Sequence, residues 1–344
     1  MATLTALFLV TALTAYVVFG GADFGGGILE ATLPHAGLKA RLQKVIAPVW
    51  EANHVWLIAV VVILFVGFPR VYTGVLTRLY LPVSLALMAI LVRGACFTLR
   101  KYDPSPGGLS HVYSVAFRAS SAVAPFAFGL IVAGLLSEHP ALPTKLDDTS
   151  PGSAGYDYYD FYVAPWWGVF AVLCGLFIAA LFAYVAAVFF YGEVHTAQDR
   201  ALIVKRIYAF LASTFVLGGA VLLTGHLTQR VPLAAGLHPI QISCQLLAAA
   251  GLFSLVRAIR RKRVWAMRFS VGAQVLAILG GWFSAQYPIL LKVAPEPLTL
   301  HNAAAPAVTL LWLNVGLVTV LSLVIPLLVV LYRVFRASDG NPPE

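Results

Sequence analysis

The sequence predicts an all-α polytopic membrane protein that crosses the bilayer about nine times. Of its 344 residues, 60% are hydrophobic and only 11% are charged, which is far outside the composition of ordinary soluble domains. The apolar residues are gathered in long runs, and a helix needs about 20 of them in succession to cross the hydrocarbon core of a bilayer. The longest polar stretch, residues 137–160, has the size of a loop, so no separate soluble domain is expected.

The first half of the chain contains four of the expected helices. No Lys or Arg precedes the first run or follows it before Lys39, so the run lacks the charge pattern of a cleavable signal and is expected to remain as a helix. The third run has an uncertain start, which could lie as early as Val71. The four predicted spans are Leu4–Leu29, Trp50–Phe68, Tyr80–Phe97 and Tyr113–Leu136.

Five further apolar runs follow in the second half. The fifth run of the chain, like the first, is longer than one crossing requires, which predicts a tilted helix or a helical extension into water. The predicted spans are Phe161–Tyr191, Ile203–Leu223, Ile240–Val256, Val264–Phe283 and Pro306–Val334.

Basic residues are concentrated in alternate loops, starting with the loop after the first span. Because cytoplasmic loops carry the excess of Lys and Arg, the N-terminus is predicted to lie outside and the C-terminus in the cytoplasm. The net charge of +9 is therefore a topology signal, and nucleic-acid binding is disfavoured because the charge is spread over separate short loops. The basic loops contain Lys39, Arg41, Lys44, Arg100, Lys101, Arg200, Lys205, Arg206, Arg257, Arg260, Arg261, Lys262 and Arg263.

Two carboxylates, Asp23 and Glu51, lie inside or at the mouth of apolar runs. A charged acid at the bilayer centre costs about 2.5–3.5 kcal/mol on insertion scales, so such a residue is a functional candidate. Around Asp23, the spacing of Gly21 and Gly25 lets a neighbouring helix approach closely, whereas a phosphate-binding loop is disfavoured because no strand precedes the glycines. An acid packed in this way without a cation tends to keep its proton, as a proton relay requires.

The second acidic motif is Trp50-Glu51-Ala52-Asn53-His54-Val55-Trp56. Glu51 and His54 are three residues apart, so they are neighbours on a helix surface and form an acid–imidazole pair that we expect to face the bundle. Glu-x-x-His is also the ligand spacing of di-iron bundles, but the other glutamates lie near loops or chain ends, which disfavours that reading. His54 could instead be a hydrogen-bonded imidazole near a helix end, and Trp50 and Trp56 could be interfacial anchors.

Cysteine and histidine placement argues against a cofactor held by this chain. Cys96, Cys174 and Cys244 are isolated in or beside apolar runs, without C-x-x-C spacing, and are expected to be small buried hydrophobes. The histidines other than His54 fall in loops or at expected helix ends, so no pair is positioned for haem ligation in mid-membrane. Any haem would belong to another chain, and no metal site is expected here.

These motifs resemble subunit II of the cytochrome bd-type quinol oxidases. An acid between Trp and Asn, ahead of Val-Trp-Leu-Ile, is the most specific feature. The last span fits the family less distinctively, through Thr309, Leu310, Asn314 and Val315. The resemblance rests on Gly21-Ala22-Asp23-Phe24-Gly25-x-Gly27-x-Leu29, Ile46-Ala47-Pro48-x-Trp50-Glu51-x-Asn53-x-Val55-Trp56-Leu57-Ile58 and Phe65-x-x-Phe68-Pro69-x-x-Tyr72.

The resemblance implies a single integral membrane domain with two four-helix bundles, residues 1–137 and 161–284, and a peripheral helix at 306–335. It implies a location in a prokaryotic plasma membrane, which is the cell inner membrane in species that also have an outer membrane. It also implies a complex that reduces oxygen to water with electrons from quinol. A partner, subunit I, would carry haem b and haem d, and a small accessory membrane subunit could join them. Subunit II would support the assembly and contribute acids to a cytoplasmic proton route.

By position, the acids of that route would be Asp23 and Glu51, with Asn53, His54 and Trp56 around them; no catalytic residue is expected in this chain. A proton-coupled secondary transporter is the main alternative, since membrane acids and glycines suit transport too. Against it, both acids lie in the first two spans, and the second half has no corresponding Gly/Pro-interrupted pair. A purely structural subunit is the third option, although inert packing compensates poorly for the insertion cost of two acids.

Overall fold

The computed structural model describes residues 1–102, 108–139, 158–231 and 238–338 of the chain. Within these ranges, the side chains of residues 51, 101, 102, 108, 325, 328, 329 and 331–338 lie outside the description.

Nine helices in the described ranges are long and apolar enough to cross a membrane, which confirms the predicted number. Apart from α2 and α7, they begin and end within six residues of the predicted limits. Helix α2 begins earlier because the helix continues through the basic segment before Trp50. The helices are α1 (Ala2–Thr32), α2 (Ala36–Val62) with its π-helical extension η1 (Ile63–Gly67), α4 (Tyr80–Tyr102), α5 (Gly108–Leu136), α7 (Val169–Tyr191), α8 (Ala197–Leu227), α10 (Pro239–Arg260), α11 (Val264–Gln286) and α12 (Ala307–Ser338).

The fifth span is not the single long helix that the sequence predicts. A short helix, α6 (Tyr158–Tyr162), is followed by a break, and α7 begins only at Val169. Pro165 in the break has no backbone N–H to donate, and Gly168 has a φ of 134°, which residues with a Cβ rarely adopt. The prediction of a helix that starts at Phe161 was therefore wrong.

The third span begins at Tyr80, because the residues before it form a separate short helix. Val71 belongs to α3 (Pro69–Arg78), and α4 begins separately at Tyr80. Pro69 occupies the first turn of α3, where its missing N–H is not needed. The later of the two predicted starts is thus confirmed.

A small two-stranded element, which an all-α prediction omits, lies in the connection between α11 and α12. Strands β1 (Ile289–Leu291) and β2 (Leu298–Thr299) are antiparallel. A parallel bridge between His139 and Val293 joins this connection to the segment after α5.

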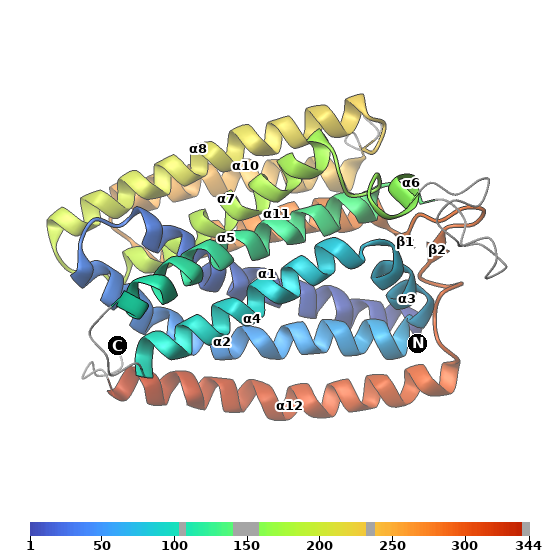
Figure 1. The fold of residues 1–344 in the computed structure, drawn as a ribbon, viewed down its shortest axis with the longest axis horizontal. Helices are drawn as coiled ribbons and strands as arrows, with labels where there is room; N and C mark the ends of the chain where they lie inside the picture. Colours follow the sequence, from blue (N-terminus) through green and yellow to red (C-terminus); the bar gives the residue numbers. More distant parts are fainter. Residues whose placement is uncertain (103–107, 140–157, 232–237, 339–344) are drawn as a thin grey trace.

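Helix α7 lies at the centre of the packing and contacts α1, α5 and α8. All residues from Leu181 to Val188 are buried, as expected for a helix that is apolar on every side. Helices α10 and α11 pack mainly on each other, while α12 lies along one edge of the molecule and contacts α1, α2 and η1 (Figure 1). The division into two four-helix bundles stays a prediction.

Glycines allow α1 to approach α7 closely. A Cβ on Gly25 would lie 1.9 Å from the carbonyl oxygen of Phe182, and a Cβ on Gly21 would lie 3.0 Å from Val185. This is the small-residue packing that the spacing predicts, and it is confirmed for both glycines.

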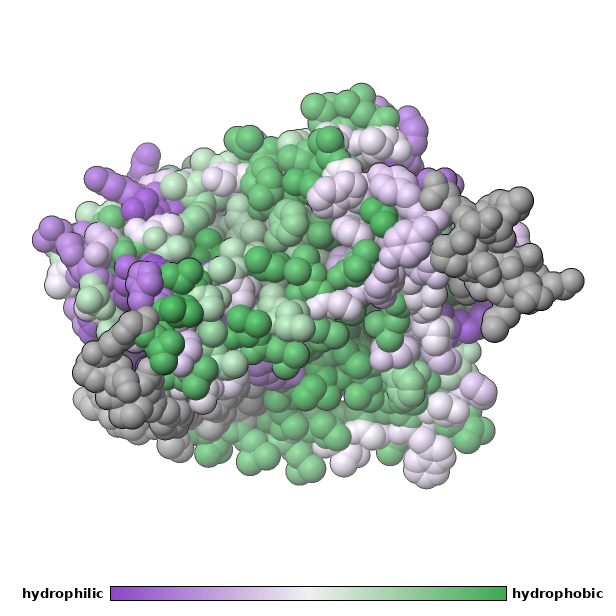
Figure 2. Space-filling view, in the orientation of Figure 1, coloured by the Kyte–Doolittle hydropathy of each residue, from purple (hydrophilic) through white to green (hydrophobic). Residues whose placement is uncertain are grey.

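The outer surface matches a bilayer environment. Figure 2 shows apolar side chains over the flank of the molecule and hydrophilic side chains gathered toward its ends. Phe215, Phe253 and Phe269 each leave 74% of their surface exposed, which a hydrocarbon environment tolerates. We call the end at which α1, α4, α7 and α10 finish the basic end. The basic residues expected in loops lie there, mostly within the last turns of α4 and α10 and the first turns of α2 and α8.

Candidate functional site

Asp23, on α1, forms a fully buried ion pair with Arg93 of α4. Nη2 of Arg93 lies 2.5 Å from Oδ1 of Asp23 and donates a second hydrogen bond, 3.0 Å long, to the main-chain oxygen of Asp23. The two side chains are 0% and 1% exposed. The expectation that Asp23 lacks a cation was therefore wrong, and the acid is held as one half of a charge pair.

Arg93 extends this contact to a third helix. Its Nε donates a 3.0 Å hydrogen bond to Oγ of Ser121 on α5, and its guanidinium lies 5.0 Å and 4.9 Å from the ring centres of Phe24 and Phe117. Cation–π contacts of this kind are strongest where water is excluded. The sequence reasoning missed Arg93, although a charged residue inside the apolar run Tyr80–Phe97 is the signal that should have marked it.

Asn53, on α2, completes the surroundings of the Asp23 carboxylate. Its Nδ2 donates a 3.3 Å hydrogen bond to Oδ2 of Asp23, and its side chain is fully buried. Two different helices thus bind the two oxygens of one acid. The structure brings Asn53 to Asp23, as the predicted site requires.

The two tryptophans of the second motif, Trp50 and Trp56, have different surroundings in the structure. Trp56 is 8% exposed and belongs to the core, so it is not an interfacial anchor. Trp50 packs edge-on against His54, with ring centres 5.2 Å apart, and against Phe97. The side chain of Glu51 lies outside the described residues, so the Glu51–His54 pair stays a prediction.

A second buried ion pair lies closer to the basic end. Arg100 of α4 binds Glu30 of α1 through two hydrogen bonds of 2.9 Å and 3.2 Å, and the side chains are 9% and 2% exposed. The Arg100 guanidinium also lies 4.8 Å from the centre of the Phe117 ring. Phe117 therefore contacts both arginines.

The two ion pairs form a ladder along α1 and α4. Asp23 and Glu30 are seven residues apart, as are Arg93 and Arg100, which is two helical turns or about 10 Å. The sequence reasoning placed Glu30 near a loop and did not connect it with the site. The matched spacing of seven in two helices that run in the same direction is the signal that could have found it.

Three buried polar atoms on α1 and α2, the helices that bear Asp23 and Asn53, lack a hydrogen-bond partner among the described residues. They are the hydroxyl of Tyr16, Oδ1 of Asn53 and Nε1 of Trp56. Tyr16 lies two turns before Asp23 on α1. Buried polar groups are nearly always hydrogen-bonded, and groups of this kind commonly bind ordered water.

Metal-ligating side chains are not gathered anywhere in the described part of the chain: no three His, Cys, Asp or Glu residues lie close enough to hold an ion there. All three cysteines are free. Cys96 and Cys174 are buried, as predicted, and Cys244 is half-buried.

The nine apolar helices of the described ranges, with charged pairs buried between them, define a polytopic membrane protein. The family model for cytochrome bd terminal oxidase subunit II matches residues 1–335, and the chain belongs to this family. It is therefore a subunit of a terminal quinol oxidase, an oxidoreductase complex, and the family implies a haem-bearing partner, subunit I. The transporter alternative is not supported.

Individual relatives agree with this assignment. Cytochrome bd ubiquinol oxidase subunit 2 of Bacillus subtilis (strain 168) is 26% identical over 352 residues, which cover 98% of this chain and 97% of that protein. Cytochrome bd-I ubiquinol oxidase subunit 2 of Escherichia coli (strain K12) is 33% identical over 89 residues, 26% of this chain and 24% of that protein. A chain of the bd oxidase from Geobacillus thermodenitrificans has the same fold, with a TM-score of 0.74 at 18% identity over 97% of this chain and 98% of that one.

Proposed function

We propose that this chain supports subunit I and carries protons toward its oxygen-reducing centre along the face of α1, α2 and α4 around Asp23. In this proposal the partner holds haem b and haem d, which pass electrons from quinol to oxygen. The single observation that carries the proposal is the Asp23 carboxylate, fully buried yet bound by Arg93 and Asn53 from two neighbouring helices. A small accessory membrane subunit stays part of the proposal.

The ion pairs suggest different roles for the acids. A carboxylate that is tightly paired with Arg is stabilised as an anion, so in this proposal Asp23 stays ionised and, together with Arg93, fixes the polar surroundings of the route. Glu51, two residues before Asn53 on α2, is then the acid that exchanges the proton. The polar atoms of Tyr16, Asn53 and Trp56 offer hydrogen-bonding groups for water between them.

The direction of transfer follows from the proposed orientation. With the basic end in the cytoplasm and the N-terminus outside, Glu30 and Arg100 lie between the cytoplasm and Asp23. Protons would pass this second pair first. Charge then moves across part of the membrane without a pumping cycle in the protein.

Glu51→Gln tests the proton route in the complex purified in mild detergent. We expect the variant to retain subunit I and its haem spectrum but to consume oxygen more slowly with quinol, because Gln cannot exchange a proton at this position. Glu296→Gln, which removes an exposed loop acid, is the matched control and should turn over normally. Unchanged turnover and proton uptake in Glu51→Gln would remove this residue from the route. A chain that purifies alone, without porphyrin, would contradict the proposed assembly itself.

A further inference from the structure

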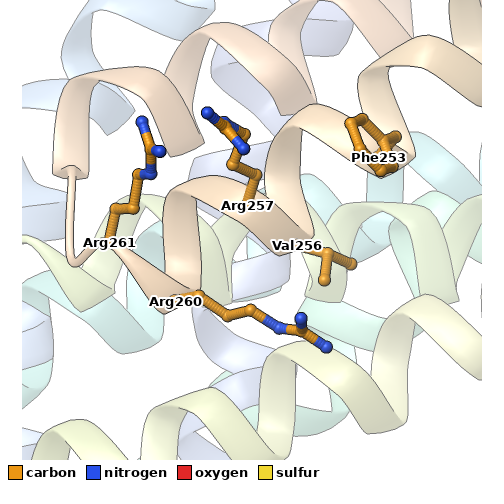
Figure 3. A pocket seen from close by; sticks show the side chains of 5 residues that line it. All are labelled: Phe253, Val256, Arg257, Arg260 and Arg261. Carbon is orange, nitrogen blue, oxygen red and sulfur yellow. The ribbon is translucent and has the colours of Figure 1, made fainter.

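A pocket of about 180 Å³ lies at the end of α10, far along the chain from the site around Asp23. It is lined by Phe253, Val256, Arg257, Arg260 and Arg261. Figure 3 shows the side chains of Arg257 and Arg261 directed to the same side of α10, as their spacing of four requires, while Arg260 points elsewhere. The ion pairs of the described residues all involve other side chains.

The positive charge of the arginines at this pocket exceeds the partial negative charge at the C-terminal end of α10. The carbonyl end of a helix carries roughly half a negative elementary charge, whereas three guanidinium groups line the pocket. No acidic side chain is among the lining residues. The pocket therefore keeps a net positive charge and is suited to an anion.

Apolar side chains on either side place the pocket at the level of the lipid headgroups. Phe253, one turn before Arg257, is 74% exposed, and Leu246, two turns before Phe253 on α10, is 66% exposed. After the basic turn, Trp265 in the first turn of α11 is 63% exposed, and Trp is enriched at membrane–water interfaces. The arginines thus lie where the hydrocarbon ends and water begins.

We propose that this pocket binds the phosphate headgroup of an anionic phospholipid, with an acyl chain along Phe253. Basic pockets at the ends of membrane helices bind such headgroups, and the guanidinium fork matches phosphate oxygens in geometry. Water occupies about 30 Å³ per molecule in the liquid, so the pocket has room for a phosphate group and water. A free phosphate ion would use only the arginines, whereas a phospholipid also covers the exposed phenylalanine.

The test compares two double variants of the complete oxidase complex in a neutral detergent. Arg257→Gln with Arg261→Gln removes two charges from the pocket, and Lys262→Gln with Arg263→Gln removes two charges from the adjacent turn, outside the lining. If the headgroup is bound in the pocket, each arginine that lines it should contribute about fivefold to binding of an anionic lipid, whereas charges outside the lining should contribute much less because water and salt screen them. Titration with phosphatidylglycerol should therefore show about 30-fold weaker binding for the pocket variant and less than about threefold for the control.

Native mass spectrometry of the same samples gives a second readout. The wild type should retain a phosphatidylglycerol molecule that the pocket variant loses, and phosphatidylcholine should not replace it. Equal weakening in both double variants would overturn the proposal in favour of diffuse surface charge. Competition by inorganic phosphate at the same concentration as the lipid would overturn it in favour of a free anion. Loss of subunit I from the pocket variant alone would overturn it in favour of a protein contact.

Discussion

Arg93 donates hydrogen bonds to both the carboxylate and the main-chain carbonyl of Asp23, and so fastens α4 to α1 at a point that water does not reach. The same guanidinium lies against the rings of Phe24 and Phe117. A charge pair in such surroundings is costly to break on one side only, because the remaining charge stays buried and unpaired. The acid therefore has a structural role beside any role in proton transfer, and experiments must separate the two.

Removing one member of this pair should harm assembly more than removing both. Asp23→Asn and Arg93→Met should each lower the stability of the complex by about 3–5 kcal/mol, since each leaves a buried polar group without its partner. The double variant should recover part of that loss, because replacement of a whole buried pair is often nearly neutral. Thermal unfolding and the haem content of the purified complex measure the effect.

The double variant also separates the two roles of Asp23. If the acid contributes to the proton route, the complex with Asp23→Asn and Arg93→Met should assemble but consume oxygen more slowly than the wild type. Wild-type turnover in a well-assembled double variant would leave Asp23 with a structural role alone. Single variants that are as stable as the wild type would contradict the buried pair itself.

The second ion pair offers a comparison between a buried and an exposed glutamate. Glu30 is 2% exposed in its pair with Arg100, whereas Glu193 is 42% exposed in its pair with Arg268. Glu30→Gln should destabilise the complex by about 3 kcal/mol, and Glu193→Gln by less than about 1 kcal/mol, because water screens the exposed pair. Equal shifts in the unfolding temperature would show that burial does not control the strength of these pairs.

The sequence predicts the helices well because their signal is local. Apolar runs of the right length locate all nine spans of the described chain, and failures occur where single residues break a run, as Pro165 and Gly168 do before α7. The small strand pair in the α11–α12 connection was missed because its strands have only three and two residues, too few to show a strand period, and the isolated bridge from His139 to Val293 joins segments far apart in the sequence. No local pattern indicates the partner in that bridge.

The sequence predicts only some residues of the candidate site, because the others depend on which helices lie side by side. Asp23 and Asn53 stand out in the sequence, but Arg93 and Glu30 are recognised only when α1 and α4 are known to lie side by side. The membrane cost of an arginine at the middle of a span marks it as paired, without showing with which acid. The matched spacing of seven residues becomes informative once the two helices are placed together.

A methyl group at Gly25 should separate α1 from α7. In Gly25→Ala the new Cβ would lie 1.9 Å from the carbonyl oxygen of Phe182, and main-chain atoms cannot turn aside as a flexible side chain can. We expect loss of most of the assembled complex, measured as haem-containing material after size-exclusion chromatography. Gly37→Ala is the control, because nothing lies within 4 Å of its Cβ and alanine favours the helix by about 1 kcal/mol. Normal assembly of Gly25→Ala would show that α1 and α7 are further apart than described.

The stability of the complex should fall in mild acid because of His139, which lies after the end of α5. Burial lowers the pKa of this histidine from its ordinary 6.5 to about 4, against the opposing effect of its hydrogen bond to the carbonyl of Gly134, and the charges of Arg78 and Arg230 lower it further. Between these two pH values the unfolded segment takes up a proton that the folded one excludes. The contribution of His139 to the stability of the folded protein is therefore complete above pH 6.5 and is lost as the pH falls toward 4. The free energy of unfolding should change with a slope of at most about 1.4 kcal/mol per pH unit.

Thermal unfolding of the wild type and of His139→Gln between pH 7.5 and 5 measures this slope. Gln can still donate a hydrogen bond but does not titrate, so the variant should lose less stability than the wild type over that range. Parallel pH profiles for the two proteins would show that His139 does not titrate as a buried group.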